Sequence, residues 1–240
     1  MHSSITTESI RTTHIPAFSR LEDRLYRIFN RVITGRLDRE HIRARLRGAC
    51  EVNLIFIKRG KQDIGFGLAT YYKARMGAET IYFVRPALGI LKDVRGGIGR
   101  KALKQYITFY IQFKMRHPFH RVYIFSAPVS PIVYAGTAKY WRESYPRYDV
   151  PTPSRIERVR QAGLAHFGLQ EVRPGILKHG FIPEIDGKDR ERFAATRKNN
   201  PHVDFFFVQN PNFLQDEGLI VIVPVNFRSI LGLLRGKRYD

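Results

Sequence analysis

The 240-residue sequence is poor in several features that define common classes of protein. It has a single cysteine, Cys50, which excludes a disulfide framework and a cysteine-rich zinc module. It contains no run of about 20 apolar residues, so we expect no transmembrane helix. Residues 1–20 lack the apolar stretch of a signal peptide. These absences predict a soluble protein of the reducing cytoplasm.

Acidic residues are scarce as well, because 21 Asp and Glu stand against 41 Lys and Arg, a formal charge of +20. With 43% hydrophobic and 12% aromatic residues, the chain is too apolar for a disordered basic tail. Arginine outnumbers lysine by 29 to 12, and its guanidinium binds phosphate and carboxylate through two parallel hydrogen bonds. The composition therefore predicts a phosphate-rich or acidic partner, such as nucleic acid, a nucleotide cofactor or an anionic membrane. A solvated basic surface is the alternative.

Hydrophobic periodicity predicts a mixed α/β protein with a mostly antiparallel central sheet flanked by helices. Residues 1–19 have no periodicity, so we expect a flexible segment there. We expect a core at 20–148 and a C-terminal part at 149–240 that completes the sheet, within one domain. Helices are predicted at 21–34, 38–46, 97–115, 131–145, 154–166 and 227–234, and strands at 52–57, 64–72, 79–84, 120–127, 203–208 and 219–225.

The densest chemical signal precedes the long helix predicted at 97–115. Glycines there allow consecutive backbone N–H groups to converge on an anion, and the helix N-terminus adds positive potential. Eight basic residues and one acid lie between Lys92 and Arg121. This arrangement suits a pyrophosphate. The residues expected to hold it are Val94, Arg95, Gly96, Gly97, Ile98, Gly99, Arg100 and Lys101.

The two common nucleotide-binding motifs do not fit this segment. A Walker loop needs Lys-Ser or Lys-Thr where the chain has Lys101-Ala102. The Rossmann pattern needs G-x-G-x-x-G and a later acid, whereas the segment has G-G-x-G and no acid on the next predicted strand. Both nucleotide-binding folds therefore fit this segment poorly.

The stretch from Val94 to Gly99 resembles the acyl-CoA motif R/Q-x-x-G-x-G/A of the GNAT N-acyltransferase superfamily, with Val94 where Arg or Gln is usual. In the alternative alignment, Arg95 takes the first position and the loop is one residue short. The predicted element order is also similar to that family over about residues 20–148. The resemblance implies a GNAT-like fold and acyl transfer from acyl-CoA, or from acyl carrier protein, to an amine or a hydroxyl.

The same resemblance implies catalytic residues. In the family, a tyrosine on the helix after the fifth strand often protonates the departing thiolate. Tyr140 looks most like that tyrosine, and Tyr134 is the second choice. Glu79 is the candidate base that deprotonates the amine, with an exposed strand-end charge as the alternative. Because the arginines at 20–47 and 154–160 exceed what a pyrophosphate needs, we expect an acidic or nucleic-acid-associated acceptor.

Other residues give weaker signals. No metal site is expected, since the histidines at 117, 120 and 166 lack ligand spacing. Cys50 is expected to be a buried structural thiol, and Phe205–Phe207 a core strand with one ring turned outward. The rival function is a non-catalytic nucleic-acid-binding protein that uses the Arg-rich helices. Peripheral membrane contact through an amphipathic helix at 227–235 is a third alternative.

Overall fold

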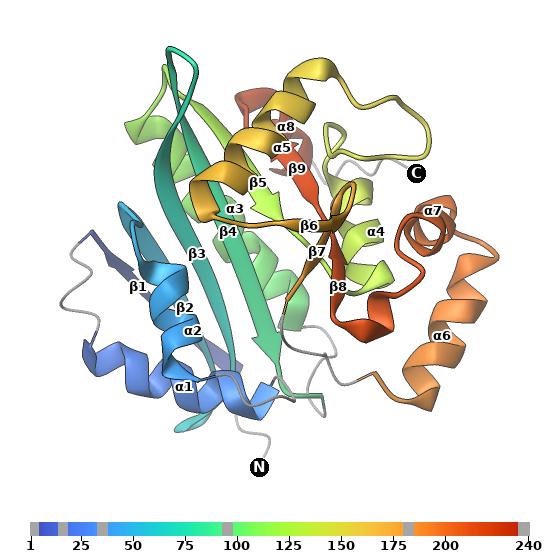
Figure 1. Cartoon of the computed structure of the whole chain (residues 1–240). Helices are drawn as coiled ribbons and strands as arrows, with labels where there is room; N and C mark the ends of the chain where they lie inside the picture. The colour runs from blue at the N-terminus through green and yellow to red at the C-terminus, as the bar shows by residue number, and fades with distance from the viewer. Residues whose placement is uncertain (1–4, 14–18, 33–37, 93–97, 180–184, 235–240) are drawn as a thin grey trace. The chain divides into compact units, whose positions relative to one another are not determined.

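The computed structural model describes residues 5–13, 19–32, 38–92, 98–179 and 185–234. Its larger sheet has six strands in the order β1-β2-β3-β4-β5-β9 (Figure 1). The pairs β1–β2, β2–β3 and β5–β9 are antiparallel. These strands are β1 (Ile5–Thr12), β2 (Glu51–Arg59), β3 (Gln62–Met76), β4 (Glu79–Ile90), β5 (Arg121–Ser126) and β9 (Val221–Pro224).

The chain forms two compact units, and each consists of two stretches of sequence. The first unit comprises Met1–Lys73 and Val84–Pro118, and the second comprises Ala74–Phe83 and Phe119–Asp240. The predicted division at residue 148 remains a prediction.

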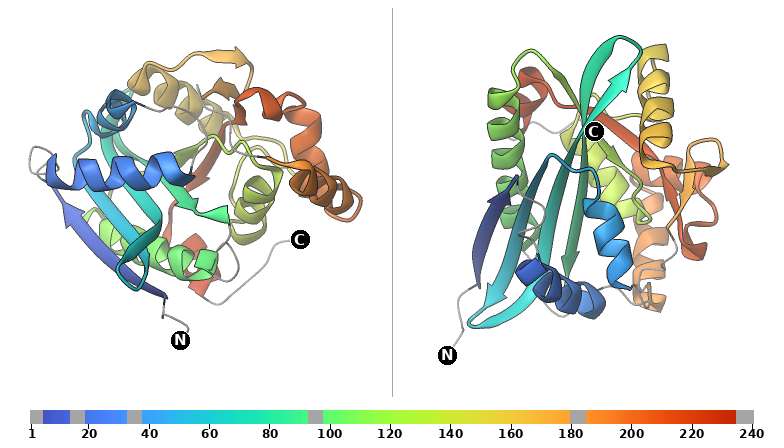
Figure 2. Two further views of the ribbon diagram at one scale, coloured as in Figure 1. Left: turned by 90° about the horizontal axis from the view of Figure 1, so that it is seen from below. Right: turned by 60° about the vertical axis from the view of Figure 1, so that its left-hand side comes forward.

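Helices cover both faces of the strands of the first unit. They are α1 (Ser19–Val32), α2 (Arg39–Leu46) and α3 (Ile98–Arg116). Figure 2 shows α1 and α2 on one face and α3 on the other. Phe29 of α1 stacks on Phe66 of β3, with ring centroids 4.8 Å apart, and Phe113 of α3 stacks on Tyr71 of β3 at 4.1 Å. The mixed α/β class with a mostly antiparallel sheet flanked by helices is therefore confirmed.

Local signals in the sequence explain the elements of this unit. In α1, Leu25, Ile28 and Phe29 are buried, as their helical spacing requires. The Asp38 side chain accepts a hydrogen bond from the His41 N–H at 2.9 Å and so caps α2. Gly60 has a φ of 59° in the turn between β2 and β3, a conformation that glycine adopts readily. The predicted helices, turn and meander are confirmed here.

The prediction of a flexible segment at 1–19 is wrong for Ile5–Thr12, which form β1. This strand pairs with β2 from Ile5 opposite Arg59 to Thr12 opposite Val52. Its sequence is mostly polar and does not alternate, so the backbone ladder, rather than apolar burial, stabilises it. Such a strand is invisible to a search for hydrophobic periodicity.

The described residues of the second unit form β5, β9, five helices and a three-stranded antiparallel sheet. In α5, Gly163 lies so close to the Phe125 ring of β5 that a Cβ at this position would come within 2.4 Å of it. Glycine therefore permits α5 to pack against the sheet. The elements are α4 (Pro131–Tyr140), α5 (Ser154–Phe167), β6 (Glu171–Arg173), β7 (Ile176–Lys178), α6 (Gly187–Arg197), α7 (Pro201–Gln209), a 3-10 turn (Phe213–Gln215), β8 (Glu217–Leu219) and α8 (Phe227–Leu234).

The strand predicted at 203–208 is wrong, because these residues belong to helix α7. The Asn200 side chain accepts hydrogen bonds from the N–H groups of His202 and Val203, and Pro201 occupies the first turn. Phe206 is fully buried, whereas its two phenylalanine neighbours are half-buried. The β-branched and aromatic composition favoured a strand, but the cap and the proline start a helix.

Smaller differences concern three other predictions. The helix predicted at 131–145 ends at Tyr140. The strand predicted at 219–225 is divided between β8 and β9. Cys50 is exposed, although its thiol donates to the Tyr71 carbonyl at 3.3 Å. The amphipathic helix at the C-terminal end is confirmed as α8.

Candidate functional site

The segment predicted to bind pyrophosphate lies at the beginning of α3. Val94, Arg95, Gly96 and Gly97 fall outside the described residues, while Ile98, Gly99, Arg100 and Lys101 form the first residues of the helix. This 19-residue helix has no acid in its first turn. Its first N–H groups have no partner within the helix, and its dipole places about half a positive charge at this end. The backbone therefore has the polarity that a phosphate group requires.

The end of β4 that leads toward this segment is held by a buried tyrosine of α3. The Tyr106 hydroxyl accepts a hydrogen bond from the Leu68 N–H of β3 at 2.8 Å and donates to the Ala87 carbonyl of β4. Gly67 makes room for it, because a Cβ there would lie 3.0 Å from the hydroxyl oxygen. Burial raises the pKa of Tyr106, so this hydroxyl stays neutral. The residue after Ala87, Leu88, exposes 48% of its surface beside this bridge.

On α2, Arg45 reaches the same strand. Its Nη2 donates to the carbonyls of Arg85 at 3.1 Å and Pro86 at 2.8 Å. Its Nε is buried and has no hydrogen-bond partner among the described residues. Burial lowers the pKa of Arg45, and burial together with the Arg45 charge lowers that of Arg85 to about 10. Two guanidinium groups therefore repel each other beside the middle of β4.

His41, one turn earlier on α2, adds a third titratable nitrogen group to this place. Burial lowers its pKa, the charges of Arg45 and Arg85 lower it further, and the Asp38 carboxylate acts in the opposite direction. We refer to His41, Arg45 and Arg85 as the α2–β4 cluster. Sequence analysis missed it, although an arginine after the apolar run Ile81–Val84 and another between Ile42 and Leu46 were available signals.

Several other arginines of the first two helices form ion pairs with carboxylates. Arg24 is held by Glu8 and Asp63 and lies 3.7 Å from the centre of the Phe56 ring. The remaining pairs are Arg39 with Asp23, Arg43 with Glu22 and Arg47 with Glu40. The Arg-rich helix pair is therefore much less available to nucleic acid than its sequence suggests. The sequence argument for the rival nucleic-acid-binding function loses support.

The two predicted tyrosines lie on α4, in the second unit, and differ in their surroundings. Tyr134 is fully buried, its hydroxyl donates to the Pro146 carbonyl at 2.8 Å, and its ring contacts Phe205 and Phe206 of α7. Burial raises its pKa. Tyr140, the last residue of α4, is half-buried, and its hydroxyl has no hydrogen-bond partner in the described part of the chain. Tyr134 is therefore built into the core, whereas Tyr140 keeps its proton accessible.

Glu79, the candidate base, begins β4 in the second unit. Its carboxylate accepts a hydrogen bond from Arg155 at 2.5 Å and forms an ion pair with Arg121 at 3.1 Å. These two arginine partners favour a structural ion pair. Glu157 of α5 forms an ion pair with Arg160 of the same helix. Two of the three arginines of α5, Arg155 and Arg160, are therefore paired with carboxylates.

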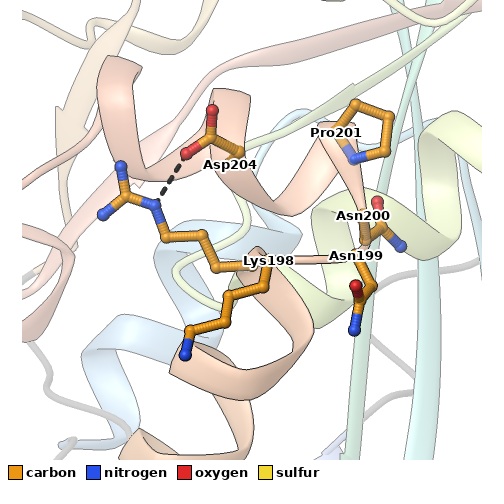
Figure 3. Close-up of a pocket in the computed structure, with 6 residues that line it drawn as sticks. Lys198, Asn199, Asn200, Pro201 and Asp204 are labelled. Atoms are coloured by element: carbon orange, nitrogen blue, oxygen red, sulfur yellow. Dashed lines mark hydrogen bonds and ion pairs between the residues drawn. The ribbon is translucent and has the colours of Figure 1, made fainter.

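A depression of about 650 Å³ lies between α6 and α7 (Figure 3). Arg197 and Asp204 form an ion pair across it at 2.7 Å, and Asn200 is occupied as the cap of α7. Its residues are Arg197, Lys198, Asn199, Asn200, Pro201 and Asp204. We assign it no catalytic role, because its opposite charges neutralise each other.

The described residues contain no group of three or more His, Cys, Asp or Glu side chains that could hold a metal ion. They also contain no helix whose length and apolar content would let it cross a membrane.

No family model and no curated protein matches the chain. Solved structures to which it is similar include Arabidopsis thaliana NAA60 in complex with acetyl-CoA, at 14% identity and a TM-score of 0.37, covering 93% of this chain and 99% of that one. A GCN5-related N-acetyltransferase from Kribbella flavida is 12% identical, with a TM-score of 0.34 and coverages of 58% and 34%. A conserved Enterococcus faecalis V583 protein of unknown function is 14% identical, with a TM-score of 0.37 and coverages of 57% and 32%. The chain thus spans about a third of the length of the last two.

Proposed function

We propose that this protein is an acyl-CoA-dependent acyltransferase that transfers the acyl group to an amine. The observation that carries the proposal is the glycine- and arginine-rich segment Val94–Lys101, which follows β4 in the sequence and includes the acid-free first turn of α3. Its resemblance to the acyl-CoA motif of the GNAT superfamily gives the ligand.

The residues at the start of α3 fit a pyrophosphate. Backbone N–H groups of the first turn and the helix dipole favour a dianionic group there, and Gly99 leaves the backbone open to it. Arg100 and Lys101, which follow Gly99 in the sequence, supply positive charge. When bound, the acyl-CoA supplies a thioester carbonyl that an amine can attack.

The remaining steps fall to side chains of the chain. Tyr140 is the proposed donor of a proton to the departing thiolate sulfur, because it is half-buried and its hydroxyl makes no other hydrogen bond with described residues. Tyr134 is not proposed, since its hydroxyl is buried and already donates to Pro146. Glu79 is not proposed as the base, since Arg155 and Arg121 hold its carboxylate. In place of Glu79, we propose that a chain of water molecules takes the proton from the ammonium group of the acceptor.

Calorimetric titration tests the donor site. We expect acetyl-CoA or a longer acyl-CoA to bind the wild-type chain with one site, and we expect the double variant Gly97→Leu/Gly99→Leu to lose that binding, because bulky side chains would fill the backbone cradle. Gly77→Ala, in the β3–β4 turn, serves as a glycine substitution elsewhere and should leave binding unchanged. Failure of every donor to bind at high micromolar concentration would refute the proposal.

A further inference from the structure

The Tyr106 hydroxyl of α3 occupies a place where the backbones of two neighbouring strands would otherwise bond to each other. The Leu68 N–H of β3 donates to the hydroxyl oxygen at 2.8 Å, and the hydroxyl donates to the Ala87 carbonyl of β4. Farther along, just beyond the end of β4, the Leu91 N–H bonds directly to the Ile64 carbonyl of β3 at 2.9 Å. A short turn joins β3 to β4, so the strands are antiparallel, and this direct bond places Leu68 opposite Ala87. The hydroxyl therefore takes the place of one ladder hydrogen bond.

Glycines shape the space on either side of this hydroxyl. A Cβ at Gly67 would lie 3.0 Å from the hydroxyl oxygen, so glycine leaves room for the tyrosine. A Cβ at Gly65 would lie 2.8 Å from the Gly89 carbonyl oxygen, so glycine there lets the two backbones approach closely. Two hydrogen bonds in series span a greater distance than one, so β4 is held away from β3 at Ala87 and lies close to it at Gly89. β4 is therefore inclined relative to β3, and Tyr106 sets the wide end of this incline.

The hydroxyl is not needed to pair the two strands. A direct bond from the Leu68 N–H to the Ala87 carbonyl would satisfy both groups, with no buried hydroxyl to accommodate. Tyr106 is only 5% exposed, and a phenylalanine would fill nearly the same space without a polar atom. The hydroxyl therefore fixes the distance between the strands in addition to satisfying their backbone groups.

Helix α3 carries both this hydroxyl and residues proposed to hold the donor. Lys101 precedes Tyr106 by five residues, which is about 7.5 Å along the helix axis. β4 ends at Ile90, and the chain then continues to the first turn of α3, which begins at Ile98. The incline of β4 therefore determines the direction from which the chain approaches the first turn of α3.

We propose that Tyr106 is a positioning residue for acyl-CoA: its hydroxyl fixes the incline of β4 against α3, and thereby the fit of the donor's pyrophosphate at the first turn of α3. This inference rests on the proposed function for the identity of the ligand. The hydroxyl is buried between two strands, so it acts through the strand and the helix and does not touch the donor. A tyrosine with a purely structural role would change the stability of the fold and leave donor affinity unchanged.

Calorimetric titration of the full chain with acetyl-CoA and with CoA, well below the unfolding temperature, tests the inference. We expect Tyr106→Phe to weaken the binding of both ligands about tenfold, because both carry the same pyrophosphate. The matched control is Thr70→Val, which removes another buried hydroxyl between the same strands, one that donates to the Arg85 carbonyl at 3.1 Å. That hydroxyl does not stand between the two backbones, so Thr70→Val should bind both ligands like the wild type.

Gly65→Ala tests the narrow end of the incline. Its Cβ would push β4 away from β3 at Gly89, and we expect it to weaken the binding of both ligands about threefold or more. This variant also keeps the inference testable if Tyr106→Phe does not fold, because wild-type affinity in Gly65→Ala would contradict a role for the incline.

Three results would overturn the inference, and they separate it from the proposed function. If Tyr106→Phe binds acetyl-CoA as tightly as the wild type, the positioning role is refuted and the proposed function stands. If Tyr106→Phe and Thr70→Val weaken binding equally, the loss of any hydroxyl between these strands suffices, and Tyr106 has no special role. If the wild-type chain binds no donor, the proposed function is refuted and this inference with it.

Discussion

Arg24 on α1 and Arg45 on α2 are the same side chain in opposite electrostatic settings. Arg24 forms hydrogen bonds to two carboxylates, those of Glu8 and Asp63, at 2.8–2.9 Å, and its pKa is raised by these bonds. Within the described part of the chain, Arg45 donates only to carbonyl oxygens, and burial lowers its pKa. A formal charge of +20 therefore says little about where positive charge is available.

Arginine has two kinds of surroundings in this chain. On α1 and α2 it mainly joins elements: Arg24 links α1 to β1 and to the start of β3, and Arg43 links α2 to Glu22 of α1. Arg45 instead donates to backbone carbonyls of β4 and, within the described part of the chain, meets no carboxylate. A guanidinium that is buried without a carboxylate partner is costly to retain.

The largest effect is expected from breaking the satisfied arginine. Arg24→Met removes the cation shared by the Glu8 and Asp63 carboxylates and leaves Glu8 with only the longer ion pair to Lys58, at 3.5 Å, among the described residues. Because these side chains are one-fifth to two-fifths exposed, we expect a loss of about 2 kcal/mol of unfolding free energy, less than for a fully buried pair. Urea denaturation measures it. The exposed Arg27→Met on the same helix should change stability by under about 0.5 kcal/mol, and equal losses in both variants would contradict the assignment.

The Tyr106 hydroxyl makes uncharged hydrogen bonds to β3 and β4, so its removal measures the contribution of hydrogen bonding without a change in charge. Tyr106→Phe removes the hydroxyl that joins Leu68 to Ala87 and leaves both backbone groups unpaired. We expect a loss of about 1.5 kcal/mol by the same denaturation measurement. No loss on Tyr106→Phe would show that β3 and β4 close directly without the bridge.

The unsatisfied arginine should cost less to remove than the satisfied one. Arg45→Met loses hydrogen bonds to two carbonyls but also removes an uncompensated buried charge, so the two contributions oppose each other. We expect a change within about 1 kcal/mol in the absence of anions. If Arg45→Met lowered the free energy of unfolding as much as Arg24→Met, Arg45 would stabilise the fold as strongly as Arg24, and this would contradict the contrast between the two arginines.

The smallest effect is on the pH dependence of stability. The pKa of His41 is lowered in the folded protein by burial and by Arg45 and Arg85, so between that value and its ordinary 6.5 the unfolded chain binds more protons. Stability should therefore fall as the pH drops below about 6.5. His41→Gln should flatten this fall in denaturation curves at pH 7.5 and 5.5. The burial-lowered His166 keeps part of the slope, and an unchanged slope would contradict the environment given to His41.

Much of the fold could be predicted from the sequence because its signals are local. The Asp38 cap, the Gly60 turn and the apolar spacing of α1 each act within a few residues. β1 and α7 could not, for opposite reasons. β1 depends on a partner strand about fifty residues away, and α7 begins at a cap that its aromatic composition outweighs in a propensity argument.

The site divides in the same way. The glycine segment before α3 is local and could be recognised, although most of it lies outside the described residues. The α2–β4 cluster joins residues forty positions apart, Arg45 and Arg85, and the sequence around either residue gives no sign that it contacts the other. The pairing of Glu79 with Arg155, 76 residues away, was equally hidden, and it weakens the role first expected for that acid.

The most direct test of the account is the release of free CoA thiol from acetyl-CoA in the presence of amines with and without a carboxylate. The account predicts amine-dependent release by the wild-type chain, reduced about 100-fold by Tyr140→Phe while calorimetry shows unchanged acetyl-CoA binding. Tyr148→Phe, an exposed tyrosine of the same unit, should leave the rate unchanged. Acetyl-CoA binding without any amine-dependent thiol release would contradict it and leave the chain a binding protein.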